Sequence, residues 1–152
     1  MHDIDGDGTE ELLLGEGYAS ISLGNMYTIN NNQAVLLEAV QWMGHLSVND
    51  VSLFMNGTLR TYDEQWGAHS ESFAANSTYY RLKDGALVFQ TTLTNDNDAV
   101  YTRYDDPGSF LNGVSITQEE YFSLKQELEG DGQVVALDWK PLREYQIEKE
   151  QN

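Results

Sequence analysis

The chain lacks cysteine and is poor in basic residues. Without cysteine, a disulfide framework, a thiolate zinc site and a cysteine nucleophile are all excluded. Eight Lys and Arg stand against 25 Asp and Glu among 152 residues, so the formal net charge is −17. A surface of this charge repels phosphate backbones and anionic lipid headgroups. The composition therefore argues against nucleic acid or an anionic membrane surface as a partner.

Long apolar runs are also missing. No stretch approaches the roughly 20 apolar residues that span a bilayer, so we expect no transmembrane segment in this chain. The first residues lack the basic and apolar regions of a signal peptide. Hydrophobic residues make up 40% of the chain and aromatic residues 11%, which is enough for one core. We expect a single domain over residues 1–152.

Turn-forming dipeptides between β-rich runs predict antiparallel hairpins, because Asn-Gly and Asp-Gly tolerate the positive φ of a tight turn. The third hairpin is less distinct, since its second arm also fits a short helix. Together with further short strands, the pattern predicts a meander of roughly eight or nine strands, mainly over 15–110. The expected hairpins are 51–55 with 58–62, 77–82 with 86–93, and 26–29 with 34–40, and the further strands are 11–14, 20–23 and 99–104.

One α-helix is predicted near the C-terminus, over 117–129. Thr117 and Glu120 have the spacing of a capping box, and Gly130 ends the helix. Three apolar side chains recur on one face, so the helix should pack on the sheet. The remaining expectations are an apolar face made of Tyr121, Leu124 and Leu128, a final extended segment at 134–142 that Pro141 ends or places on an edge, and a polar tail at 144–152.

The motif with the clearest chemistry lies at the N-terminus. Carboxylates occupy positions 1, 3, 5 and 9 of a loop beginning at residue 3, with glycine at position 6 and a backbone carbonyl available at position 7. Ca²⁺ takes about six to eight oxygen ligands, and alternate residues of a tight loop can direct their oxygens inward. Mg²⁺ fits less well because it demands tight octahedral geometry. The predicted calcium ligands are Asp3, Asp5, Asp7, the carbonyl of Thr9, and Glu11.

This loop departs from an EF-hand. Position 12 is Leu14 instead of glutamate, and an apolar strand follows where an EF-hand has a helix. The DxDGDGxxEL pattern resembles the calcium loops of FG-GAP repeats. With the β-meander, the capped helix and the ending Asp138-Trp-Lys-Pro-Leu142, the chain also resembles secreted or lipid-anchored domains of Gram-positive bacteria. The resemblance implies a secreted or surface-anchored protein of largely uncharacterised function, in which a signal or anchor segment precedes Met1.

Ca²⁺ in this loop is expected to be structural, because a terminal loop frays unless it is tied down. We therefore expect a calcium-binding, surface-associated binding or structural module rather than an enzyme. A carbohydrate or cell-wall binding module, or a protein-binding one, would instead display Trp66 from a polar loop. A hydrolase with a structural calcium is a further hypothesis. An acidic inhibitor that mimics nucleic acid fits the charge but gives no reason for the calcium spacing.

Several polar groups elsewhere in the chain give weaker signals. The three histidines lack any zinc-binding spacing, and the segment 69–72 contains residues of a triad without a nucleophile elbow. Aspartates around 94–107 and acids at 127–131 could form a second cation site, but turns and a helix end explain them better. Two triplets match glycosylation acceptors and also fit turn chemistry. The residues concerned are His2, His45, His69, Asp96, Asp98, Asp105, Asp106, Glu127, Glu129, Asp131, Asn56 and Asn76.

Overall fold

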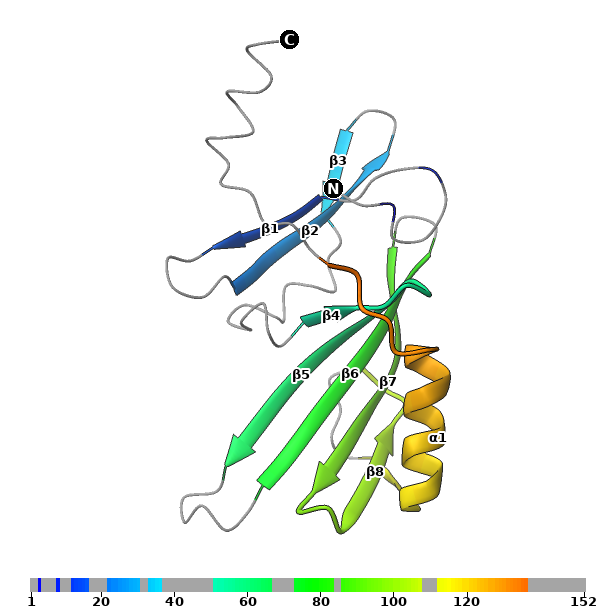
Figure 1. The fold of residues 1–152 in the computed structure, drawn as a ribbon. Coiled ribbons are helices and arrows are strands. Elements are labelled where there is room, and N and C mark those ends of the chain that lie inside the picture. The colour runs from blue at the N-terminus through cyan, green and yellow to red at the C-terminus, as the bar shows by residue number, and fades with distance from the viewer. Residues whose placement is uncertain are drawn as a thin grey trace.

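The computed structural model describes residues 3, 8, 12–16, 22–30, 33–36, 51–66, 73–83, 86–107 and 112–136. These residues form nine strands in two antiparallel sheets, and one helix, as the sequence predicts for a mainly β chain with a single C-terminal helix (Figure 1). The elements are β1 (Leu12–Glu16), β2 (Ser22–Asn30), β3 (Gln33–Leu36), β4 (Val51–Leu53), β5 (Thr58–Trp66), β6 (Phe73–Lys83), β7 (Ala86–Asp96), β8 (Val100–Tyr104), β9 (Val114–Ile116) and α1 (Gln118–Glu129).

The larger sheet is a six-stranded meander in the order β4-β5-β6-β7-β8-β9. Its first hairpin joins β4 to β5 through Asn56-Gly57, and Gly57 has the positive φ of 80° that favours glycine. Its second hairpin pairs β6 with β7 over most of their length, with a register shift after Tyr79. Both predicted hairpins are confirmed. Strand β4 ends at Leu53 instead of residue 55, and β5, β6 and β7 are longer than the segments predicted from the sequence.

The smaller sheet has the order β1-β2-β3, with β2 in the centre. The strands predicted at 20–23 and 26–29 are in fact one strand, β2, so that division was wrong. Leu14 pairs with Asn25 and Gly15 with Leu23, which leaves Gly24 as the extra residue of a bulge. A bulge lets the strand continue through a glycine that reads as a break in the sequence. Residues 33–36 form β3 rather than a helix, and the predicted continuation to residue 40 lies outside the described residues.

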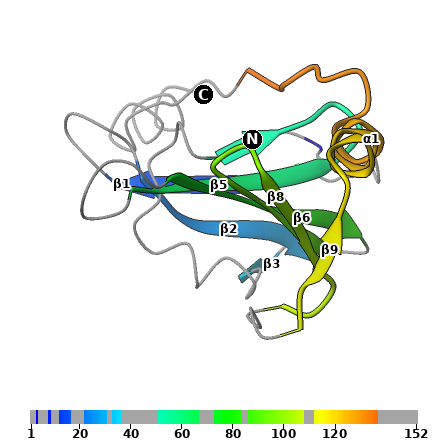
Figure 2. The ribbon, with the colours of Figure 1, turned by 90° about the horizontal axis from the view of Figure 1, so that it is seen from below.

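Helix α1 lies on one face of the six-stranded sheet, and β9 leads into it (Figure 2). The Thr117 hydroxyl accepts a hydrogen bond from the Glu120 backbone, and the Glu120 carboxylate accepts one from the Thr117 backbone at 2.8 Å. The predicted capping box is therefore confirmed. Gly130 ends the helix at a φ of 64°, as expected.

The core beneath α1 is rich in tyrosine. Tyr79, Leu93, Tyr101 and Tyr121 are buried together, and the rings of Tyr101 and Tyr121 lie 5.0 Å apart. Burial of such large side chains supplies most of the free energy that holds a helix on a sheet. The predicted apolar face is confirmed, because Tyr121 is buried and Leu124 and Leu128 pack against this cluster.

The segment after α1 returns to the edge of β4. Phe54 and Val134 form an isolated antiparallel bridge, and the Val135 amide donates to the Leu53 carbonyl at 2.7 Å. The extended segment predicted from residue 134 thus begins as a partner of the β4 edge, although its part from 137 to 142 lies outside the described residues. The close return places the end of α1 beside the first hairpin of the larger sheet.

Candidate functional site

The N-terminal loop is described at two of its positions. The Gly8 amide donates a hydrogen bond of 3.1 Å to Oδ2 of Asp3, which joins loop position 6 to loop position 1. Gly8 has a φ of 88°, a conformation that L side chains rarely adopt. This bond brings loop position 6 next to loop position 1.

The remaining predicted calcium ligands, Asp5, Asp7, Thr9 and Glu11, lie outside the described residues. Within the part of the chain that the structure describes, no group of three or more His, Cys, Asp or Glu side chains is arranged to hold a metal ion. Strand β1 begins at Leu12, directly after the loop. The expectation that a strand follows the loop, where an EF-hand has a helix, is confirmed.

Trp66 does not lie in a loop, contrary to the prediction. It is the last residue of β5, and its backbone pairs with Phe73 of β6. Strand β5 continues through the polar residues 63–65, which the sequence alone suggested were a connection, because the long partner strand β6 pairs with them. The Trp66 side chain lies outside what the structure describes, as do His2, His45 and segment 69–72.

Two of the aspartates around β8, Asp96 and Asp98, lie at the turn between β7 and β8. Asn97 and Asp98 both have positive φ, 52° and 54°, between β7 and β8, as a tight hairpin turn requires. Asn95 Nδ2 donates to Asp98 Oδ1 at 2.7 Å, and Arg103 pairs with Asp105 at 3.0 Å. This arrangement matches the turn interpretation that the sequence favours for Asp96 and Asp98, while Asp105 follows β8 and pairs with Arg103.

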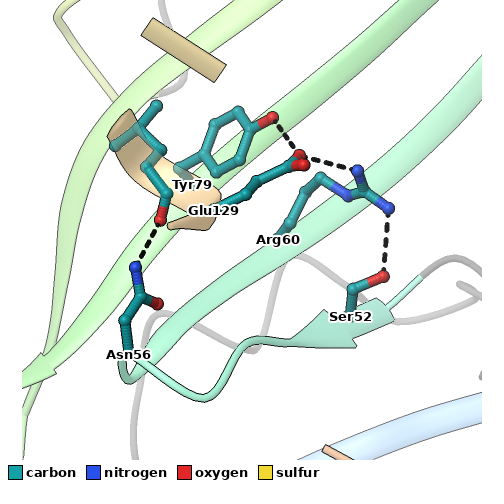
Figure 3. Close-up of polar contacts among 6 residues, drawn as sticks. Ser52, Asn56, Arg60, Tyr79 and Glu129 are labelled. Atoms are coloured by element: carbon teal, nitrogen blue, oxygen red, sulfur yellow. Dashed lines mark hydrogen bonds and ion pairs between the residues drawn. The ribbon is translucent and has the colours of Figure 1, made fainter. Parts of the chain in front are cut away.

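A polar cluster that sequence reasoning missed connects α1 to the larger sheet (Figure 3). Oε1 of Glu129 accepts hydrogen bonds from Arg60 at 2.7 Å and from the Tyr79 hydroxyl at 2.8 Å. Arg60 also donates to the Ser52 hydroxyl at 3.1 Å. Beside them, Asn56 Nδ2 donates to the Leu128 carbonyl at 2.9 Å. These contacts attach the last turn of α1 to strands β4, β5 and β6.

The ion pair in this cluster is largely buried. The side chains of Arg60 and Glu129 are 21% and 14% exposed, and the guanidinium lies 5.4 Å from the centre of the Phe54 ring and 5.9 Å from that of Tyr62. Such cation–π contacts favour a guanidinium that has lost part of its water. The Nε atom of Arg60 is buried without an acceptor among the described residues. The positive charge of the guanidinium is therefore compensated by the Glu129 carboxylate.

Two tyrosines of this region have raised pKa values. Burial, followed by the Glu129 carboxylate and its hydrogen bond, raises the pKa of Tyr79 far above its ordinary value, and Arg60 opposes the rise. Burial and the 2.6 Å hydrogen bond to Glu64 raise the pKa of Tyr62 to about 12. Both phenols are therefore protonated donors at neutral pH. Within the cluster, the charges of Arg60 and Glu129 balance each other, as in a contact that stabilises the fold.

Comparison with protein-family models, curated proteins and solved structures found no match to this chain. The resemblance to surface domains of Gram-positive bacteria therefore stays a prediction. Among the described residues, no helix combines the length and apolar character that crossing a membrane requires.

Proposed function

We propose that this chain is a calcium-binding β-meander module in which the ion has a structural role. The ligands are the oxygens of Asp3, Asp5, Asp7 and Glu11 and the carbonyl of Thr9. The ion connects the N-terminal loop to β1, which starts at the next residue, and so holds the edge of the three-stranded sheet. It supplies charge compensation to four carboxylates that otherwise repel one another.

The observation that carries this proposal is the hydrogen bond from Gly8 to Asp3. In a calcium loop the glycine at position 6 makes the sharp turn, and here Gly8 has both that position and the positive φ that a sharp turn needs. Its amide donates to Oδ2 of Asp3 and so orients the carboxylate at loop position 1. The spacing and the turn are independent features that agree.

The ligand set favours a weak site. Without a bidentate glutamate at position 12, fewer charged oxygens are available than in an intracellular calcium sensor. Affinity in such loops follows the number of charged ligands and the rigidity of the site, and modules outside the cell bind with Kd values on the order of 10⁻⁴–10⁻³ M. A weak site is useful where calcium is abundant, so we propose a secreted or surface-anchored location.

Thermal unfolding with excess Ca²⁺ and with chelator tests this function. At a hundredfold excess over Kd, binding to the folded chain alone contributes about 2.7 kcal/mol, which corresponds to a rise in Tm of about 5–10 °C for a chain of this size. Asp5→Ala should abolish the rise. Asp106→Ala, which removes the same charge from an exposed turn, should keep it. The proposal fails if Ca²⁺ leaves the Tm unchanged, or if both variants respond as the parent chain does.

A further inference from the structure

The first hairpin of the larger sheet contains a residue pair with its own chemistry. An Asn-Gly pair loses ammonia spontaneously because glycine has no side chain to hinder attack by its amide nitrogen on the preceding carboxamide. The chain has two such pairs, Asn56-Gly57 and Asn112-Gly113. We propose that Asn56 is a site of spontaneous deamidation whose rate is controlled by the docking of α1. This inference is independent of calcium binding.

The reaction requires freedom that the folded hairpin denies. The Gly57 amide nitrogen must lose its proton and attack Cγ of Asn56, so that a C–N bond forms and the Cγ–Nδ2 bond breaks. The released nitrogen takes up a proton and leaves as ammonia. Water then opens the cyclic imide at either carbonyl, which yields aspartate or isoaspartate at position 56. Solvent supplies the water and the base, and nothing is oxidised or reduced.

Three hydrogen bonds oppose this attack. The Gly57 amide, which must become the nucleophile, donates to the Phe54 carbonyl at 3.0 Å. The Asn56 carboxamide accepts from the Thr58 amide at 3.1 Å and donates to the Leu128 carbonyl at 2.9 Å. The carboxamide cannot turn toward the Gly57 nitrogen without breaking both of its own bonds. The last of them is a bond to the final turn of α1.

The end of α1 is shaped to receive Asn56. A side-chain carbon at Gly130 would lie 3.2 Å from Asn56 Nδ2, so the glycine leaves room for the amide to reach Leu128. The same contact excludes a glycan at Asn56 in the folded hairpin, because Nδ2 is the atom that would carry it. The Arg60–Glu129 ion pair holds this turn in place one residue further on. Loss of that pair should therefore release Asn56.

The product would not restore the contact. A carboxylate at position 56 has no proton to donate to the Leu128 carbonyl, and it would face the negative end of the helix dipole beside Glu129. Isoaspartate would in addition lengthen the backbone of a tight turn. Deamidation during a transient opening thus makes the release of the helix end permanent.

Asn112 provides an internal control. It is exposed, and its side chain makes no hydrogen bond to any residue that the structure describes. The folded chain and the chain in urea are incubated in mildly alkaline buffer, and peptide mapping by mass spectrometry measures the conversion of each asparagine. For each site, the rate in the folded chain is divided by its rate in urea. This ratio should be at least about tenfold lower for Asn56 than for Asn112, because several hydrogen bonds must break first.

Variants connect the rate to α1. Glu129→Gln should raise the rate at Asn56 several-fold and leave that at Asn112 unchanged, whereas Glu127→Gln, on an exposed side chain of the same turn, should change neither. If the Glu129→Gln variant does not fold, Tyr79→Phe is used in its place, because it removes only one hydrogen bond from Glu129. Asn56→Asp should lower the Tm more than Asn112→Asp. The proposal is overturned if the ratio for Asn56 is no lower than that for Asn112, or if weakening the Glu129 contacts leaves the Asn56 rate unchanged.

Discussion

Replacing Glu129 by glutamine measures what holds α1 on the sheet. The change keeps the size of the side chain but removes the charge that compensates Arg60 and strengthens the hydrogen bond from Tyr79. An exposed ion pair contributes up to about 1 kcal/mol, and breaking a fully buried one costs about 3–5 kcal/mol. With 14–21% of these side chains exposed, the cost should lie between these limits, at about 2 kcal/mol.

One effect acts in the opposite direction. A carboxylate at the C-terminus of a helix is disfavoured by the helix dipole, so its neutralisation returns about 0.3–1 kcal/mol. Glu127→Gln removes an exposed charge from the same turn and measures this gain without touching Arg60. The difference between the two variants isolates the contacts of Glu129.

Urea unfolding followed by circular dichroism gives the free energy of each variant, and about 2 kcal/mol corresponds to a fall in Tm of about 4–8 °C. A double substitution, Arg60→Met with Glu129→Leu, should recover part of the loss because no charge remains buried. If Glu129→Gln and Glu127→Gln agree within about 0.5 kcal/mol, the cluster does not stabilise the helix and the reasoning is refuted.

Two further substitutions test the helix and its core. Thr117→Ala should destabilise the chain by about 1 kcal/mol at neutral pH. Hydrogen bonds from Thr117 lower the pKa of Glu120, so this loss of stability should shrink as the pH falls through that lowered pKa. Urea titrations across the acidic range measure the change. Tyr79→Phe should destabilise the chain at neutral pH. The difference in stability between this variant and the parent chain should shrink above the ordinary tyrosine pKa of 10.0, because the raised pKa of Tyr79 contributes stability that is lost as the pH rises. Alkaline unfolding monitored by tyrosinate absorbance measures this difference, and a constant value would contradict the prediction.

The elements that the sequence predicts well are those encoded by neighbouring residues. The hairpin at Asn56-Gly57 and the capping box at Thr117 depend on contacts within a few positions, so their residue types suffice to identify them. Strand β9 was missed because three residues, Val114–Ile116, are too few to show alternation. These residues form a strand because they pair with the neighbouring strand β8.

Long-range polar contacts could not be predicted in the same way. Arg60 and Glu129 are 69 positions apart, and each looks like an ordinary surface charge in its own segment. The pairing depends on where α1 crosses the sheet, which the burial of Tyr121 and Tyr79 decides. Periodicity indicates that the helix has an apolar face, but it does not give the position of that face along the strands.

The net charge of −17 also determines how the calcium experiment must be carried out. A chain with this excess of carboxylates repels itself, so any cation stabilises it to some extent by screening. Screening by salt is already nearly complete at 1 M, where the Debye length is about 3 Å, whereas a coordinated Ca²⁺ lies about 2.3–2.6 Å from its ligands. A rise in Tm that persists in high salt, and that Mg²⁺ does not reproduce, is therefore due to coordination in the loop. A rise that high salt abolishes is due to the charge of the whole surface, and Asp106→Ala should then alter it as much as Asp5→Ala does.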